Sequence, residues 1–399
     1  MNIINKKHIY TTFLLLPYFF AVTGMLVLDS GDKKMIPLFL IGIIASILAF
    51  KKETILSNLR SPFIWLVSIS CIYTIFSYYY HGASSRELRA LIGSTLFLIF
   101  FPYNLLNHRV LGWVVLLGSI TAFLNSVYFN VYMGISRDAG YINPIPYATS
   151  CALIAIISFS LLIEQPSFKE KLIASLAFLL SLPPIILSET RGIWLALTVS
   201  TLVLVIFKYI KTPPSRNQLT FIFITVTVSL FSGTYLFKDK IIERYDQTVY
   251  EVEKIQSGNY NTSIGQRLQL WQLAPQLIQK KPLLGYGNEK PKLLQDKLKN
   301  KKISNLTFRL ASHHYHNQFL NKMVKSGVIG LIFIIGLLLY PLIIVKKLPS
   351  IDAYIAIGLV SLLFIAGLTD VPFNHPQPLI LYLLFLVPIC SRCKRVTND

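Results

Sequence analysis

The sequence predicts an all-α protein that crosses a membrane many times and carries one large loop outside it, and three observations support this prediction. Of the 399 residues, 53% are hydrophobic and only 14% are charged, and the mean hydropathy is positive. The apolar residues fall in blocks of roughly 16 to 22 with almost no charge inside, about the length that a helix needs to cross the hydrocarbon core. A single long basic stretch, residues 238–325, interrupts these blocks.

Twelve such blocks are expected to be membrane-spanning helices. Lys6 and Lys7 precede the first block, and no small-residue cleavage site follows before Asp29, so we expect a retained signal anchor. An even number of spans places both ends of the chain on the same side of the membrane. The predicted spans lie near residues 9–28, 35–50, 62–80, 88–103, 110–133, 144–163, 172–187, 192–209, 219–237, 326–345, 353–370 and 378–391.

The basic residues indicate which side is cytoplasmic, because Lys and Arg in short loops are retained there. Sixteen of them lie in one set of tails and short loops, and only six lie in the opposite short loops. We therefore expect both termini in the cytoplasm. The long loop then lies on the far side of the membrane.

Three parts of the chain are predicted: 1–237 with the first nine spans, 238–325 as the outer loop with the catalytic elements, and 326–399 with three more spans and a cytoplasmic tail. The outer loop holds sixteen Lys and Arg residues and only seven acids. Such a charge suits anionic membrane lipids, and it also suits a substrate that bears phosphate. A nucleic-acid partner is not expected.

Short amphipathic helices are expected in the outer loop. Apolar residues recur at helical spacing over 242–255, which indicates a helix near the membrane. Ser263 and Gln266 fit a capping box, which would place Arg267 in the first turn of a second helix. Because the helix dipole is already positive there, an arginine at that point favours a bound phosphate, although an exposed surface arginine also fits the pattern. Trp271, one turn later, could support a sugar ring or pack at the membrane interface.

Three of the seven histidines lie within four positions, at His313, His314 and His316. Histidines are common zinc ligands, but no carboxylate lies nearby in the sequence, and neither a His-Glu-x-x-His motif nor a set of cysteines is present. We therefore expect no metal site. An imidazole titrates near neutral pH and can take a proton from a sugar hydroxyl, so a general base is the favoured interpretation.

Arg191 lies in a tight outer turn between the predicted seventh and eighth spans. A charge this close to the bilayer is costly, so it should have a partner. It could pair with Glu189 and extend toward the interface, or it could face inward and bind an anion. Asp370, at the outer end of the eleventh span, could orient an arginine or a histidine, or it could only cap its helix.

Four stretches of the chain together resemble the O-antigen ligase and polymerase superfamily, and the resemblance covers most of the sequence. His316 and Asn317, followed after nine residues by Gly327 and Gly330, are similar to the motif at the end of the large periplasmic loop of the ligases. The other three stretches follow the order of the family. They are 190–195 (TRGIWL), 265–268 (GQRL) and 367–371 (GLTDV).

This resemblance implies a GT-C-like enzyme of the bacterial inner membrane with a periplasmic active site. It would transfer O-antigen polysaccharide from undecaprenyl diphosphate to a sugar hydroxyl of the lipid A core, with inversion and without a metal or cofactor. The resemblance assigns diphosphate binding to Arg191 and Arg267 and activation of the acceptor hydroxyl to His316. Diphosphate is a good leaving group that needs charge neutralisation more than acid catalysis, and arginines supply it. The supporting residues would be His314, Asn317, Trp271, Gly327, Gly330 and Asp370.

Three other functions fit parts of the pattern. An O-antigen polymerase belongs to the same superfamily. A protein O-oligosaccharyltransferase is disfavoured because members of that group usually carry an extra C-terminal periplasmic domain. A lipid-linked glycan transporter is disfavoured because transporters place polar and charged residues in the middle of the membrane, whereas here the spans are nearly uncharged.

Overall fold

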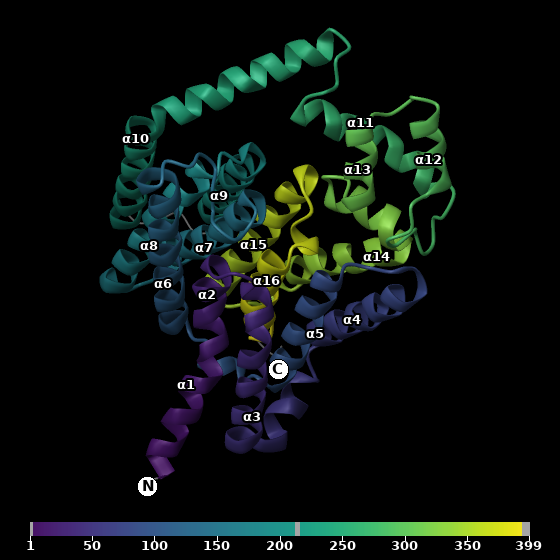
Figure 1. Ribbon diagram of the computed structural model, residues 1–399. Coiled ribbons are helices and arrows are strands. Elements are labelled where there is room, and N and C mark those ends of the chain that lie inside the picture. The colour runs from purple at the N-terminus through teal and green to yellow at the C-terminus, as the bar shows by residue number, and fades with distance from the viewer. Residues whose placement is uncertain (1–2, 212–215, 393–399) are drawn as a thin grey trace.

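Within residues 3–211 and 216–392, which the computed structural model describes, the chain forms helices and no strand. The all-α prediction is therefore confirmed. The helices of the main bundle are α1 (Ile3–Val22), α2 (Gly24–Val27), α3 (Gly31–Asn58), α4 (Pro62–His81), α5 (Ser85–Phe100), α6 (His108–Ser126), α7 (Pro144–Glu164), α8 (Phe168–Leu187), α9 (Arg191–Lys211), α14 (Gln318–Ile343), α15 (Ser350–Thr369) and α16 (Pro376–Cys390). The outer loop contributes the second half of α10 (Arg216–Gln256), α11 (Ser263–Ile278), α12 (Lys292–Lys299) and α13 (Asn305–His313), and the last three of these lie together beyond one end of the bundle (Figure 1).

Nine helices in the described residues are long and apolar enough to cross a membrane, which fits a multi-pass membrane protein. The predicted count of twelve is not confirmed. The other three predicted spans, near 88–103, 219–237 and 378–391, fall in α5, the first half of α10 and α16. α5 has 16 residues and α16 has 15. At 1.5 Å a residue these helices reach about 24 and 22 Å, less than a hydrocarbon core of about 30 Å.

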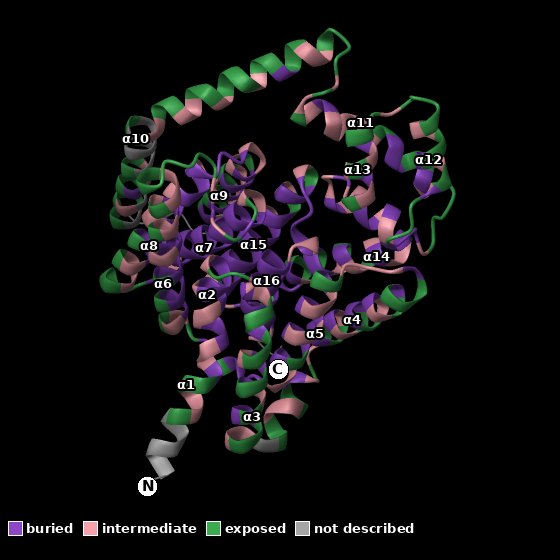
Figure 2. Cartoon of the chain, in the orientation of Figure 1, coloured by how far each residue is buried: buried purple, intermediate pink, exposed green. Residues whose placement is uncertain are grey.

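The centre of the bundle is formed by α7, α15 and α16 (Figure 2). Nearly every residue of α7 and α16 is buried, as expected for helices that are apolar on all sides. Helices at the periphery instead expose large apolar side chains, among them Leu48 on α3 (60% exposed) and Ile72 on α4 (64% exposed). Such outward-facing side chains suit contact with lipid rather than water.

α10 bends at Phe237, where φ is −123° and ψ is 18°. The bend coincides with the predicted boundary between 1–237 and 238–325. The first half of α10 packs on α8, where Thr225 and Ser175 share a hydrogen bond of 2.9 Å. The second half crosses the end of the bundle toward α11 (Figure 1). It contains the helix predicted over 242–255 and ends at Gln256.

The outer loop has an apolar core of its own. Side chains from α11, α12, α13, the first part of α14 and the segments between them pack into one cluster. The loop is therefore a packed unit that can hold side chains in fixed positions. The buried members of the cluster are Leu270, Leu273, Ala274, Leu277, Tyr286, Leu294, Ala311, Tyr315 and Val324.

α14 begins at Gln318, eight residues before the predicted span at 326–345, and it is broken at Gly327. Gly327 has φ 63° and ψ −167°, a conformation that is essentially restricted to glycine. Segment 282–287 fills the break: Tyr286 N donates to Val324 O and Val328 N donates to Pro282 O, both at 2.8 Å. A Cβ at Gly327 would overlap the backbone of Leu283. Gly327 of the His-Asn motif is therefore required by the backbone conformation and by the close approach of Leu283.

α15 connects the two ends of the bundle. Near its start, Asp352 binds His108 and Arg392, each at 2.8 Å. This is the end of the bundle at which α1 begins and α16 finishes (Figure 1). At its other end α15 stops at Thr369, and Asp370 follows as the capping residue. That end faces the outer loop.

Candidate active site

Asp370 joins two histidines that come from different segments. Its Oδ1 lies 3.3 Å from Nδ1 of His316, and its Oδ2 lies 3.3 Å from Nε2 of His375. The Asp370 side chain is only 6% exposed. His375 directly follows the short helix η4 (Pro372–Asn374) and was not among the predicted site residues.

The ionisation of Asp370 fixes how the two rings are protonated. Burial acts to raise the pKa of Asp370, but hydrogen bonds from His316 and His375 outweigh burial and hold the pKa far below its usual range. An ionised carboxylate only accepts hydrogen bonds, so Nδ1 of His316 and Nε2 of His375 each carry a proton. Nε2 of a neutral His316 is then left as a proton acceptor.

His316 lies in the segment between α13 and α14, with φ 45° in the left-handed region. The residues on either side of it, Tyr315 and Asn317, form hydrogen bonds with α11, α14 and α15. The indole N–H of Trp271 donates to Tyr315 O at 3.0 Å. The side chain of Asn317 caps α14 by accepting from Phe319 N at 3.1 Å, and it donates to Leu368 O at 3.2 Å. Trp271 and Asn317 thus position the histidine segment.

His314 packs against His316, with ring centroids 4.2 Å apart and the ring planes at 79°. Its Nδ1 is buried and has no hydrogen-bond partner within the described residues. Burial, reinforced by the neighbouring His316, lowers the pKa of His314 to about 4. His314 is therefore neutral at pH 7.

We expect the stability of the protein to depend on pH through His314. In the unfolded chain His314 binds a proton below about 6.5, whereas in the folded protein it does so only below about 4. The free energy of unfolding should therefore fall, by on the order of 1 to 3 kcal/mol, as pH falls through this window. The pKa of Asp370 is lowered from 3.8, so the stability it contributes is lost only at still lower pH.

Thermal unfolding in nanodiscs at pH 7 and pH 5 measures this effect. The His314→Gln variant should lose less of its Tm between the two pH values than the wild type does. An identical drop in both proteins would contradict the prediction.

No carboxylate lies near these histidines in the sequence, but the fold brings Asp370 beside two of them. Ligand atoms of His314, His316 and Asp370 all lie within 4.8 Å of one another, although Asp370 is 54 residues away from His316 in the chain. Such a set could hold a metal ion. It can also act without one, because a carboxylate that accepts from an imidazole orients the ring and stabilises its protonated form.

Arg191 is the first residue of α9, and its guanidinium is hydrogen-bonded to the second half of α10. Its Nη1 donates to Thr248 Oγ1 and its Nη2 to Glu251 Oε1, both at 2.7 Å. Pairing with Glu189, one of the two alternatives considered, is not found: Glu189 accepts instead from Arg244 at 2.5 Å. Arg191 therefore keeps donors available for a ligand beside the partners that fix its position.

Arg267 lies on α11, whose start differs from the prediction by one residue. The cap is Thr262, whose hydroxyl accepts from Gly265 N at 3.1 Å, so Ser263 is the first helical residue and Arg267 opens the second turn. The free N–H of Ile264 is taken by Glu251 Oε2 at 2.8 Å. The anion at this helix end is thus the protein's own carboxylate, shared with Arg191. Within the described residues, the Arg267 guanidinium makes no hydrogen bond or ion pair.

The two predicted arginines line one pocket together with Asp370. Its empty space, including the part that opens to solvent, is about 500 Å³. Gly192, which follows Arg191, packs against Thr369, which precedes Asp370, and a Cβ there would overlap the threonine hydroxyl. The remaining residues that line the pocket are Arg137, Ile145, Glu189, Thr190, Ile193, Arg244, Gln247 and Ser263.

The pocket suits an anion. Four of the residues that line it are arginines, and two are acids. Burial lowers the pKa of the Arg267 guanidinium, and the charge of Arg191 lowers it further, while Asp370 and Glu251 act to raise it. Burial and the neighbouring arginines likewise lower the pKa of Arg137. A bound phosphate group would relieve the repulsion among these cations.

The fold and the site define a multi-pass helical membrane protein with an arginine-lined outer pocket beside a histidine and carboxylate cluster. Residues 176–335 match the family model described as O-Antigen ligase (Wzy_C), which supports a relationship of this part of the chain to the O-antigen ligase superfamily. The match includes Arg191, Arg267 and His316, and it confirms the resemblance seen in the sequence. A protein of Haemophilus influenzae, described as uncharacterized, is 25% identical over 353 residues, which cover 85% of this chain and 86% of that protein.

Proposed function

We propose that this protein is an O-antigen ligase that joins O-antigen polysaccharide, carried on undecaprenyl diphosphate, to a sugar hydroxyl of the lipid A core. One observation supports this most strongly. Arg191 and Arg267 line the same pocket as Asp370, and Asp370 is hydrogen-bonded to His316. A group that binds diphosphate and a group that can remove a proton therefore lie side by side.

The proposed reaction is an inverting displacement. The acceptor oxygen attacks the anomeric carbon of the donor, and its proton passes to Nε2 of His316. The bond between the anomeric carbon and the diphosphate oxygen breaks, and undecaprenyl diphosphate leaves with one more negative charge. Arg191 and Arg267 bind that developing charge, while Asp370 stabilises the protonated imidazole.

The site would lie on the periplasmic face of the bacterial inner membrane, with both termini in the cytoplasm. The excess of Lys and Arg on the opposite short loops supports this orientation. The nine candidate spans found in the described residues, and an outer unit that packs over one end of the bundle, fit an enzyme whose lipid-linked donor and lipid-linked acceptor both reach it from the membrane.

The reaction is proposed to need no metal. Transfer by the purified protein should then continue at an unchanged rate in a chelator. Loss of activity in the chelator, restored by added Zn²⁺, would assign a metal to His314, His316 and Asp370 instead.

The lipopolysaccharide of a strain that lacks the gene tests the function. A ligase predicts core lipopolysaccharide without O-antigen and an accumulation of lipid-linked polymer. A single repeat unit on the core would identify a polymerase. Lipid-linked polymer that is trapped on the cytoplasmic side would identify a transporter.

A further inference from the structure

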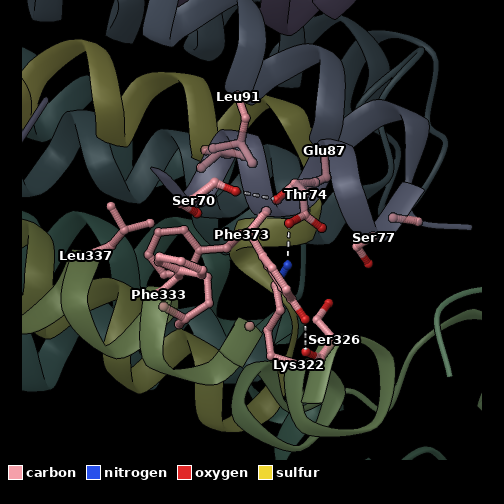
Figure 3. Close-up of a pocket in the computed structure, with 15 residues that line it drawn as sticks. Ser70, Thr74, Ser77, Glu87, Leu91, Lys322, Ser326, Phe333, Leu337 and Phe373 are labelled. Atoms are coloured by element: carbon pink, nitrogen blue, oxygen red, sulfur yellow. Dashed lines mark hydrogen bonds and ion pairs between the residues drawn. The ribbon is translucent and has the colours of Figure 1, made fainter. Parts of the chain in front are cut away.

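Lys322 and Glu87 form a buried ion pair that takes no part in the chemistry proposed above. Lys322 lies on the first part of α14, and Glu87 lies in the first turn of α5. Their side chains are 8% and 7% exposed. The Lys322 ammonium donates directly to Glu87 Oε1, and both side chains line a small cavity together with Ser70, Thr74 and Ser326 (Figure 3). Burying both charges costs solvation energy, so their retention calls for a reason.

The second oxygen of Glu87 begins a chain of hydrogen bonds. Glu87 Oε2 accepts from Asn374 Nδ2 at 3.1 Å. Asn374 Oδ1 in turn accepts from Gln318 Nε2 at 3.1 Å and from Asn321 Nδ2 at 3.2 Å. Asn374 is therefore a junction between α5, α14 and η4, and Glu87 is its acceptor on α5.

The chain reaches both segments that carry histidines of the site. Asn321 Oδ1 accepts from the backbone N–H of Tyr315 at 3.3 Å, and Gln318 Oε1 accepts from Phe373 N at 2.9 Å. Tyr315 directly precedes His316, and Asn374 directly precedes His375. These hydrogen bonds therefore connect the segment that carries His316 to the segment that carries His375.

We propose that Glu87 is a positioning residue for glycan transfer: by fixing Asn374 it sets the spacing of His316 and His375 around Asp370. The role of Lys322 is to neutralise the buried charge of Glu87. This inference rests on the proposed function, because it assumes that His316 is the base. A base displaced by about 1 Å can lose about 100-fold in rate, so a distant link of this kind can matter.

The alternative is that the pair only stabilises the bundle. Two double variants separate these roles, because both remove the ion pair without leaving an unpaired charge. Glu87→Leu/Lys322→Met removes the acceptor for Asn374. Glu87→Gln/Lys322→Met keeps a carbonyl oxygen that can accept from Asn374, while the hydroxyls that line the cavity can accept from the new amide.

Transfer by the purified full-length variants in nanodiscs provides the measurement. For Glu87→Leu/Lys322→Met we expect kcat to fall about 10- to 100-fold, with KM for the donor changed only a few fold. For Glu87→Gln/Lys322→Met we expect kcat to recover to within a few fold of the wild type. Glu164→Leu/Lys208→Met is the matched control, because it removes a largely buried ion pair between α7 and α9. It should leave kcat unchanged.

Equal kcat values in the two Glu87 variants, whether both normal or both low, would overturn the proposal. So would an equal loss in the control. Failure of the proposed function is recognised separately: it would appear as absence of transfer by the wild type or as full transfer by His316→Ala.

Discussion

Replacement of His316 by alanine should reduce kcat for glycan transfer about 100- to 10,000-fold while the protein still folds and inserts. In the proposed reaction, Nε2 of His316 takes the proton from the hydroxyl of the acceptor sugar, and no other group of the cluster has this role. The other ring nitrogen of His316 is held by Asp370 at 3.3 Å. The variant leaves a pocket that can still bind the donor, so KM for the donor should change little.

His313→Ala is the matched control. His313 ends α13 three residues earlier and is exposed, and it lies outside the cluster around Asp370. Its removal should leave the rate unchanged. Wild-type transfer by His316→Ala, or an equal loss in both variants, would show that His316 is not the base.

Replacement of Arg267 by alanine should lower kcat about 100- to 1,000-fold, because a group that binds charge developing in the transition state is lost. Arg267 is a cleaner test than Arg191, whose removal would leave the 2%-exposed Glu251 without its guanidinium partner. Arg267→Lys keeps the charge but loses the planar guanidinium and its paired donors. Its kcat should therefore lie between that of Arg267→Ala and that of the wild type.

Arg309→Ala is the control for charge alone. Arg309 is an exposed arginine on α13 in the same outer loop, and it does not line the pocket. Purified variants, assayed over a range of donor concentrations, separate kcat from KM. A pure increase in KM for Arg267→Ala would mean that Arg267 binds the donor no more tightly in the transition state than in the ground state.

Features that depend on neighbouring residues in the chain could be predicted from the sequence. Hydropathy predicts the long spans, and periodicity predicts the second half of α10, including its end at Gln256. Of the predicted His-Asn motif, His316 lies beside Asp370 and Asn317 caps α14. The count of twelve spans is not confirmed, because α5 and α16 are shorter than the length that a membrane-spanning helix needs.

Features that depend on distant contacts could not be predicted. His316 and Asp370 lie 54 residues apart in the chain, and only the fold brings them together. His375 follows Asp370 closely in the sequence, but that spacing alone does not show that the two side chains are hydrogen-bonded. Glu251 links Arg191 to the start of α11, although its place in the sequence suggests only the polar side of an amphipathic helix. Asp370 was considered for orienting an arginine or a histidine, but which side chain it contacts follows only from the fold.

The central claim is that Arg191 and Arg267 together bind the diphosphate of the donor beside His316. Electron cryomicroscopy of the protein in nanodiscs with undecaprenyl diphosphate tests it most directly. We expect density for the two phosphates in the pocket between these arginines, on the side of Asp370. Phosphate density bound elsewhere on the protein, with this pocket empty, would contradict the claim.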